Sequence, residues 1–218
     1  FTIPLSDKVV TPHSYTKKLK SDHLKFNGYY ELCYLHPNYF SKRKYVNSKK
    51  KSIMLRFVSW DASHDIGKNG LSLIEKLLLV KYLSKRYKIY LSSETELPSK
   101  IYDFCSRFDP LSAHEKLASC DFYIGEGATM ASEAACLGIP SIYVSNRVLG
   151  YIEELKNNYN LIYQTTSLKA IISWMNRFEM SHKESLVSSF DKMLNDKEDV
   201  TAYMLDVIEE YANNGLGE

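Results

Sequence analysis

The sequence has no apolar run long enough to cross a membrane and no secretion signal. No segment reaches 18 consecutive apolar residues, and the opening FTIPLSDKVV has no basic stretch ahead of an apolar one. These absences exclude a spanning helix and predict a cytoplasmic location. The sequence also lacks an initiating Met and opens inside what reads as a strand, so we interpret it as part of a longer chain or a processed product.

Metal-binding and nucleophile motifs are also missing. The four cysteines (Cys33, Cys105, Cys120 and Cys136) form no C-x-x-C pair, which predicts free, mostly buried thiols in a reducing compartment. No segment resembles a P-loop or a nucleophile elbow. We therefore predict no metal and no cofactor.

Charge is nearly balanced overall but unevenly distributed. Residues 1–51 contain 11 Lys and Arg against 3 Asp and Glu, whereas residues 52–218 contain 17 against 23. The basic stretch 42–51 would suit an anion, an acidic partner or a peripheral membrane contact, although a solvated linker is the simpler interpretation. We expect no nucleic-acid binding, because groove-reading elements are absent.

Apolar strands alternate with helical segments along most of the chain. This pattern predicts an α/β fold, a Rossmann-like parallel sheet with helices on both faces. We expect residues 1–51 to be the end of an N-terminal domain with a basic linker, and residues 52–218 to be a C-terminal domain. Strands are expected at 9–10, 53–59, 87–92, 122–124, 141–144 and 160–163, and helices at 14–19, 71–86, 100–108, 110–119, 148–157, 167–178, 182–195 and 199–212.

Two helices carry more detailed expectations. In the helix at 71–86, the apolar positions Leu73, Leu77, Val80 and Leu83 predict the buried face. In the helix at 110–119, Ser112 and Glu115 have the spacing of a capping box. The same helix is expected to direct Leu111 and Leu117 inward.

The stretch 121–144 organises the chain, because it reads as strand, Gly-Glu-Gly turn, helix and strand. Gly125 and Gly127 would let a ligand approach the backbone, and the following helix N-terminus suits a phosphate. Thr129 and Ser132 add hydroxyl donors, and Glu133 could accept hydrogen bonds from two neighbouring sugar hydroxyls. The alternatives are a turn without function and a Glu133 that faces water.

A long polar loop, 60–70, follows the strand at 53–59. His64 is the candidate general base for transfer to an acceptor hydroxyl, oriented by Asp61 or Asp65. Trp60 would stack on a base or sugar, or only pack the loop. The alternative for His64 is simple exposure.

Further polar residues lie where strands or loops end. Ser92 and Ser93 end a strand at the expected ligand-facing edge and are candidates for substrate binding. His114, at the start of its helix, could meet a phosphate, although a surface position is the simpler interpretation.

Several blocks in order resemble the DUF354 proteins, a family of unknown function. These blocks are LRFVSWDASHDIG, LSSETELP and IGEGATMASEAACLGIPSI, with NGYYELCYLHPNYF between the two expected halves. That family is similar to the GT-B glycosyltransferases and the UDP-N-acetylglucosamine 2-epimerases. The resemblance implies two Rossmann-like domains facing across a cleft, of which this chain supplies the C-terminal one.

The resemblance also implies roles for individual residues. The turn that receives a diphosphate would comprise Gly125, Glu126, Gly127, Ala128 and Thr129, and Glu133 would bind the ribose hydroxyls. The loop that begins Ser59-Trp60 would approach the donor phosphates or sugar. Glu126 departs from the pattern, because an acidic side chain repels a diphosphate unless it points away or grips a sugar hydroxyl or a metal.

These observations predict a UDP-sugar-binding domain of a glycosyltransferase in polysaccharide or glycoconjugate assembly. The first alternative is a sugar-nucleotide 2-epimerase, and the second is a non-catalytic nucleotide-sugar-binding or interaction domain. The expected partners are the nucleotide-sugar and an N-terminal domain. Because that domain would hold half of the site, we expect this part alone to be inactive.

Overall fold

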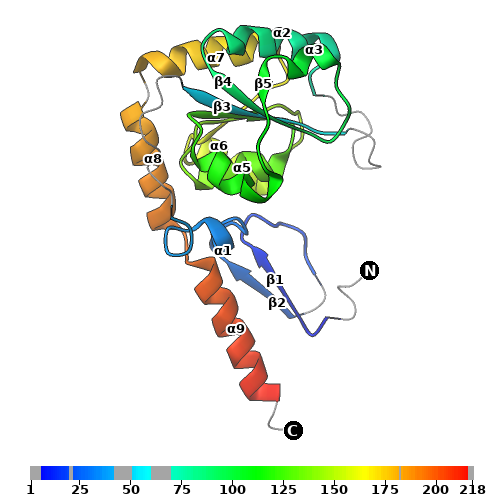
Figure 1. Ribbon diagram of the computed structural model, residues 1–218. Coiled ribbons are helices and arrows are strands. Elements are labelled where there is room, and N and C mark those ends of the chain that lie inside the picture. The colour runs from blue at the N-terminus through cyan, green and yellow to red at the C-terminus, as the bar shows by residue number, and fades with distance from the viewer. Residues whose placement is uncertain (1–5, 20–21, 42–50, 60–69, 182, 216–218) are drawn as a thin grey trace.

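The computed structural model describes residues 6–19, 22–41, 51–59, 70–181 and 183–215. Figure 1 shows the arrangement of its helices and strands. In chain order these are β1 (Lys8–Pro12), β2 (Asp22–Phe26), α1 (Leu32–Leu35), β3 (Ser52–Phe57), α2 (Leu73–Ser84), β4 (Lys88–Ser93), α3 (Ser99–Tyr102), β5 (Cys105–Ser106), a 3-10 turn (Pro110–Ser112), α4 (Ala113–Ala118), β6 (Phe122–Gly125), α5 (Ala128–Cys136), β7 (Ser141–Tyr143), α6 (Gly150–Asn157), β8 (Ile162–Gln164), α7 (Leu168–Ser181), α8 (Lys183–Asp196) and α9 (Val200–Gly215).

Six parallel strands form the central sheet in the order β5-β4-β3-β6-β7-β8. Within this sheet, the chain enters at the central strand β3, continues outward through β4 to the edge strand β5, and then returns to the centre at β6. This is the strand order of Rossmann folds, and the reversal between β3 and β6 is its topological switch point. Arg56 of β3 pairs with Gly125 of β6 at the carboxyl end of both strands. The predicted α/β class is confirmed.

Helices cover both faces of the sheet, with α2, α3 and α7 on one side and α5 and α6 on the other (Figure 1). Strand β3 shows why both faces are buried. Ile53, Leu55 and Phe57 pack toward α2 and α7, whereas Met54 between them packs into the opposite cluster. Alternating side chains that are all apolar are typical of a parallel strand covered on both faces.

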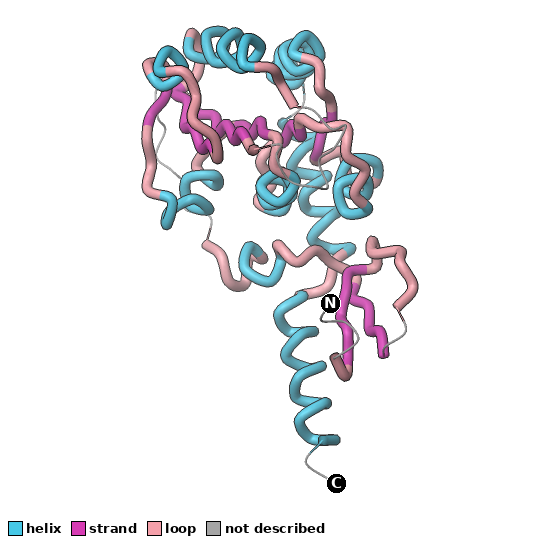
Figure 2. Tube along the Cα trace, turned by 90° about the vertical axis from the view of Figure 1, so that its right-hand side faces the viewer, coloured by secondary structure: helices cyan, strands magenta, loops and turns pink. Residues whose placement is uncertain are grey.

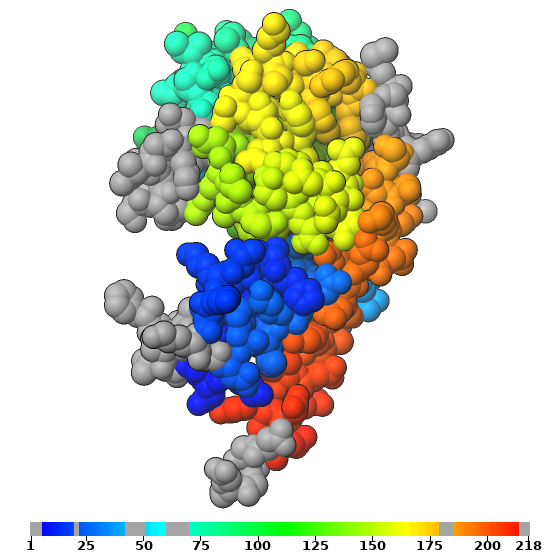
Figure 3. Space-filling view, turned by 180° about the vertical axis from the view of Figure 1, so that it is seen from behind, coloured from blue at the N-terminus to red at the C-terminus, as the bar shows by residue number. Residues whose placement is uncertain are grey.

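The first and last parts of the chain form a second unit beside this sheet. Strands β1 and β2 pair in parallel, and α9 leaves the sheet to extend along them (Figures 1 and 2). The space-filling view from behind shows the N-terminal segments, in blue, beside the C-terminal helices, in orange and red (Figure 3). Polar bonds fasten them, including one from the Thr201 hydroxyl to the Cys33 carbonyl at 2.6 Å. The predicted division after residue 51 stays a prediction, but α9 contacts the part that precedes it.

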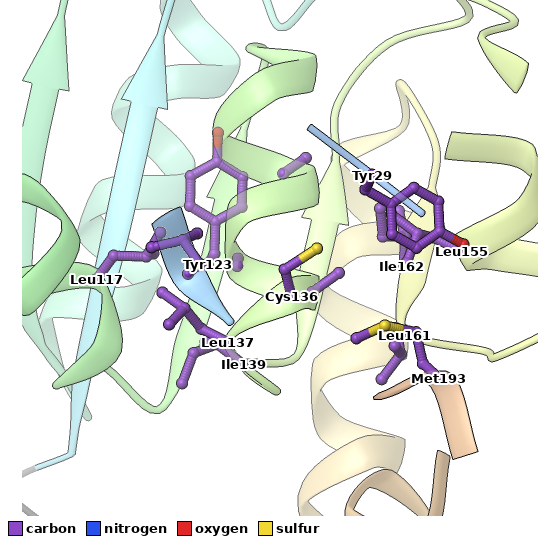
Figure 4. Packing of buried hydrophobic residues seen from close by; sticks show 14 of the residues in the cluster. Tyr29, Leu117, Tyr123, Cys136, Leu137, Ile139, Leu155, Leu161, Ile162 and Met193 are labelled. Atoms are coloured by element: carbon purple, nitrogen blue, oxygen red, sulfur yellow. The ribbon is translucent and has the colours of Figure 1, made fainter. Parts of the chain in front are cut away.

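A buried cluster joins the two units. Tyr29, which follows β2, is 1% exposed and belongs to the same cluster as Leu155 of α6 and Ile162 of β8. Figure 4 shows its ring beside these two side chains. Gly150, at the start of α6, lies so close to the second unit that a Cβ there would be 2.3 Å from the Ser14 carbonyl oxygen. The two units therefore share a packed interface.

Two predicted helices are wrong or shortened. Residues 14–19 form no helix; the Tyr15 N–H closes a turn onto the Pro12 carbonyl instead. A helix so short has too few hydrogen bonds to offset its nucleation cost. The expected helix at 100–108 stops at Tyr102, because Cys105 and Ser106 pair with β4 as the edge strand β5.

The predicted buried faces and cap also need correction. Leu73 is 55% exposed and Leu111 is 93% exposed, whereas Lys76 of α2 is buried. The capping box belongs to Ser72 and Glu75 at the start of α2. Ser112 makes no cap bond to its helix and donates its hydroxyl to the Asp109 carbonyl at 2.9 Å.

The four cysteines are free, and Cys120 and Cys136 are buried. Burial raises the pKa of the Cys120 thiol to about 11, so it stays protonated. Across the described ranges, every helix is too short or too polar to cross a bilayer. Residues 42–50, most of the basic stretch 42–51, lie outside those ranges, so their predicted contacts stay predictions.

Candidate functional site

A pocket opens at the switch point of the sheet. It has a volume of about 270 Å³ and lies at the carboxyl ends of β3 and β4 and the N-terminus of α5. Open parallel sheets bind ligands at this place, because neighbouring connections diverge there and leave a crevice. The pocket is lined by Arg56, Val58, Glu94, Gly127, Ala128, Thr129, Met130 and Glu133.

The turn between β6 and α5 is shaped from below by Tyr123. This tyrosine is fully buried and donates its hydroxyl to the Gly127 carbonyl at 3.3 Å. The bond requires glycine at position 125, because a Cβ there would lie 2.1 Å from the Tyr123 hydroxyl oxygen. Burial raises the pKa of Tyr123 well above its ordinary value, so the hydroxyl remains a donor.

Gly127 acts differently from Gly125. Its φ of −86° suits any residue, and a Cβ would make only ordinary contact, 3.5 Å from Val58. Gly127 is the N-cap of α5 and has no side chain with which to cap the helix. The N–H groups of the first helical turn have no carbonyl within the helix to bind, and the helix dipole places positive charge there. The sequence thus leaves an uncapped helix start facing the pocket.

Glu126, between the two glycines, points away from the pocket. Its carboxylate accepts the Val58 N–H at 3.0 Å and the Leu71 N–H at 2.9 Å. It also pairs with the Lys76 ammonium at 3.1 Å, and both side chains are almost completely buried. Glu126 therefore anchors both ends of the β3–α2 connection, and its charge is already compensated.

Arg56 supplies the cationic side of the pocket. Its guanidinium bonds to the Ser92 hydroxyl and pairs with the Glu94 carboxylate at 2.5 Å. The other Glu94 oxygen accepts the Ser59 N–H at 3.2 Å. The Ser93 hydroxyl instead donates to the Thr95 carbonyl at 2.8 Å. Ser59 and Ser92 thus lie around Arg56 and Glu94, while Ser93 turns into its own loop.

Glu133 forms the other wall of the pocket and is only 7% exposed. Its Oε1 accepts the Tyr34 hydroxyl at 2.9 Å and lies 3.1 Å from the His114 Nε2. The rings of Tyr34 and His114 are neighbours, with centroids 5.2 Å apart. Burial, and next the Glu133 carboxylate, raise the pKa of Tyr34, so Tyr34 donates the hydrogen.

Ser132, next to Glu133, does not reach the pocket. Its hydroxyl is fully buried and bonds to the Glu31 carboxylate and to the Thr129 carbonyl. Burial raises the pKa of Glu31, and the Ser132 hydrogen bond partly offsets this rise. Ser132 connects α5 to the segment before α1.

The structure brings Ala128, Thr129, Gly127 and Glu133 together at one pocket and sets His114 behind Glu133. Trp60, Asp61, His64 and Asp65 lie outside the described residues, so their roles stay predictions. Three residues at or beside the site were not predicted from the sequence, namely Tyr34, Glu94 and Lys76. Lys76 had one available signal, a charged residue between apolar neighbours on α2, whereas nothing in the local sequence links Tyr34 to Glu133.

Residues 1–213 match the model of a family described as protein of unknown function, DUF354. The chain belongs to the DUF354 family. No curated protein matches its sequence.

Solved structures share the fold of this DUF354 chain. The wall teichoic acid polymerase TagF matches 99% of this chain and 60% of its own, with a TM-score of 0.57 and 15% identity. A putative UDP-N-acetylglucosamine 2-epimerase from Listeria monocytogenes matches 87% and 54%, with a TM-score of 0.56 and 13% identity. The S. aureus protein MnaA, solved with UDP, matches 84% and 53%, with a TM-score of 0.53 and 10% identity.

At these identities the similarity shows a common fold, that of the GT-B glycosyltransferases and UDP-N-acetylglucosamine 2-epimerases. The chain spans 53–60% of the length of these three proteins.

Proposed function

We propose that this chain binds a nucleotide-sugar at the switch-point pocket and is the donor-binding part of a glycosyltransferase. One observation carries the proposal. The uncapped start of α5 and the nearly buried carboxylate of Glu133 line the same pocket. A nucleoside diphosphate has complementary groups for both, namely phosphate oxygens and ribose hydroxyls.

The diphosphate would lie at the start of α5. Anions bind there because the first-turn N–H groups point at them and the helix dipole favours negative charge. Thr129, in the first turn, and Arg56 line the same pocket and add a hydroxyl and a guanidinium. Glu126, the acidic residue of the turn, does not oppose a diphosphate, because its charge is paired with Lys76 away from the pocket.

The ribose would lie beside Glu133. Oε1 of this carboxylate already accepts from Tyr34 and contacts His114. Oε2 has no hydrogen-bond partner among the described residues. It is also not enclosed, because the Tyr29 hydroxyl is the only buried side-chain nitrogen or oxygen among those residues that lacks a hydrogen-bond partner. Oε2 is therefore available to a ligand in the pocket, and its two lone pairs could accept from both ribose hydroxyls.

The second candidate is a sugar-nucleotide 2-epimerase, which uses the same donor site. The fold supports it as well, since a protein described as a putative epimerase and a polymerase match this chain with nearly equal TM-scores, 0.56 and 0.57. Both candidates need further groups from an opposing domain. Incubating a protein that contains both this chain and an opposing domain with a UDP-sugar, with and without an acceptor, separates them by product: an epimerised sugar nucleotide, or free UDP together with a glycosylated acceptor.

Calorimetric titration tests the binding proposal. We expect UDP to bind the 218-residue chain. Glu133→Ala should weaken UDP binding at least tenfold, because hydrogen bonds to a charged group contribute roughly 1.5–3 kcal/mol. A sugar phosphate without a nucleoside should bind weakly to both proteins. Glu153→Ala serves as the control, since Glu153 lies on α6 and pairs with Lys156.

Absence of UDP binding by the folded chain would contradict the proposal. Equal weakening by Glu133→Ala and Glu153→Ala would contradict the assignment of Glu133 to the site.

A further inference from the structure

We propose that Tyr34 and His114 are positioning residues that hold the Glu133 carboxylate for the ribose, so that α1 confers selectivity for ribonucleotides. This inference rests on the proposed function and extends it to residues outside the pocket lining. Tyr34 belongs to α1, which precedes the six-stranded sheet, while His114 belongs to α4.

The two oxygens of Glu133 have different surroundings. Oε1 accepts from Tyr34 at 2.9 Å and lies 3.1 Å from His114, and two donors fill its two lone pairs. Within the described part of the chain, Oε2 has no hydrogen-bond partner. The arrangement therefore fixes the carboxylate by one oxygen and leaves the other for the ligand, which spares the ligand the cost of ordering the side chain.

The donors themselves are held in place. The Tyr34 ring packs against the His114 ring at 5.2 Å. One helical turn before Tyr34, Glu31 bonds to the Ser132 hydroxyl. Residues three apart in a helix lie on the same face, so Glu31 and Tyr34 together bind the adjacent residues Ser132 and Glu133 of α5. Tyr34 is thereby fixed relative to α5, as a positioning residue must be.

The chemistry of the ligand follows from this geometry. A carboxylate oxygen held in one position binds only hydroxyl groups that lie at hydrogen-bond distance from it. It does not affect the phosphate contacts at the N-terminus of α5. Loss of the Tyr34 hydroxyl should therefore weaken recognition of the ribose 2′-hydroxyl and not recognition of the diphosphate.

The test compares UDP, 2′-deoxyuridine diphosphate and pyrophosphate as titrants of the unmodified chain and of Tyr34→Phe. The unmodified chain should prefer UDP to the deoxy compound. Tyr34→Phe should weaken UDP binding about three- to tenfold, the range expected for one ordinary hydrogen bond, because Tyr34 acts on the ligand only through Glu133. It should also reduce the preference for UDP over the deoxy compound, while pyrophosphate binding is unchanged. Adding His114→Ala to Tyr34→Phe should reduce the preference further.

Tyr39→Phe is the matched control. Tyr39 follows the same helix, is 50% exposed against 40% for Tyr34, and donates its hydroxyl to the Asp199 carboxylate at 3.0 Å. It should leave all three affinities unchanged.

The outcomes separate the two proposals. If UDP binds and Glu133→Ala weakens it, but Tyr34→Phe keeps the full preference for UDP over its deoxy form, the positioning role is wrong and the proposed function stands. Equal weakening of UDP and pyrophosphate by Tyr34→Phe would also overturn the positioning role, since it indicates a general structural effect. If the unmodified chain binds no UDP, the proposed function fails and this inference fails with it.

Discussion

At the scale of single residues, Glu126 and Glu94 show how burial changes what a carboxylate does. Glu94 lines the pocket, Glu126 lies beside it, and both pair with a cation. The Glu126 side chain is completely buried with Lys76, whereas that of Glu94 is 44% exposed beside Arg56. Removing one partner of a buried pair leaves an uncompensated charge, while an exposed pair is screened by water.

We therefore expect Glu126→Gln to lower the free energy of unfolding by about 3–5 kcal/mol. Glu94→Gln, the same chemical change at an exposed pair, should cost less than about 1 kcal/mol. Adding Lys76→Met to Glu126→Gln should recover much of the loss, because it removes the unpaired ammonium. Urea denaturation measures all three variants, and equal costs for the two Glu→Gln changes would show that the buried pair does not stabilise the fold.

Distance along the chain separates the site residues that were predictable from those that were not. Gly125, Gly127, Thr129 and Glu133 were predictable as a group, because they are close in the chain and follow one strand. Tyr34 lies 99 positions before Glu133, and only the packing of α1 on α5 brings them together.

At the scale of elements, the strands and most helices followed from periodicity, but their ends and buried faces depended on packing. The predicted capping box at Ser112 and Glu115 has the right spacing, yet the box forms at Ser72 and Glu75. Asp109 explains the difference, because its carboxylate caps the 3-10 turn that precedes α4 by accepting the Leu111 N–H at 3.0 Å. Spacing alone cannot distinguish two Ser-x-x-Glu sequences when a third residue competes.

These two serines provide a matched test. Ser72→Ala should destabilise the protein by about 1 kcal/mol, because the Ser72 hydroxyl accepts the Glu75 N–H at the start of α2. Ser112→Ala should cost clearly less, because its hydroxyl only donates to a carbonyl in an exposed turn. Thermal or urea denaturation of both variants gives the comparison, and a larger cost for Ser112→Ala would contradict the assignment of the box.

At the scale of the whole molecule, the sheet and its layers were predictable from alternating apolar segments, whereas the path of α9 was not. Contacts between the two ends of the chain, such as that of Thr201 with Cys33, depend on the turn after α8. Glu31 lies buried where the second unit contacts α5. That position makes the interface sensitive to pH.

Burial raises the pKa of Glu31, opposed by the Ser132 hydrogen bond and reinforced by Glu133. The folded chain therefore holds this proton to higher pH than the unfolded chain. Its contribution to stability is complete below the unfolded pKa and is lost as pH rises through the folded pKa. As pH rises from the unfolded to the folded pKa of Glu31, Glu31→Gln should become more stable than the unmodified protein. Above the folded pKa the difference in free energy of unfolding should stay constant.

Urea denaturation at several pH values between about 4 and 8 measures this difference. The difference in free energy of unfolding between the two proteins does not contain the contributions of other carboxylates. Asp199, whose pKa is lowered in the folded state, is one of these. An advantage of Glu31→Gln that does not change with pH would contradict the account of Glu31.

The most direct test of the central claim is to map UDP onto the backbone amides by nuclear magnetic resonance. If the chain binds a nucleoside diphosphate at the switch point, the largest shifts on adding UDP will be those of Gly127, Ala128 and Thr129, with a smaller shift at Glu133. Absence of shifts, or shifts centred on the apolar pocket around Phe122, Ile139 and Val187 at the opposite end of the strands, would contradict it.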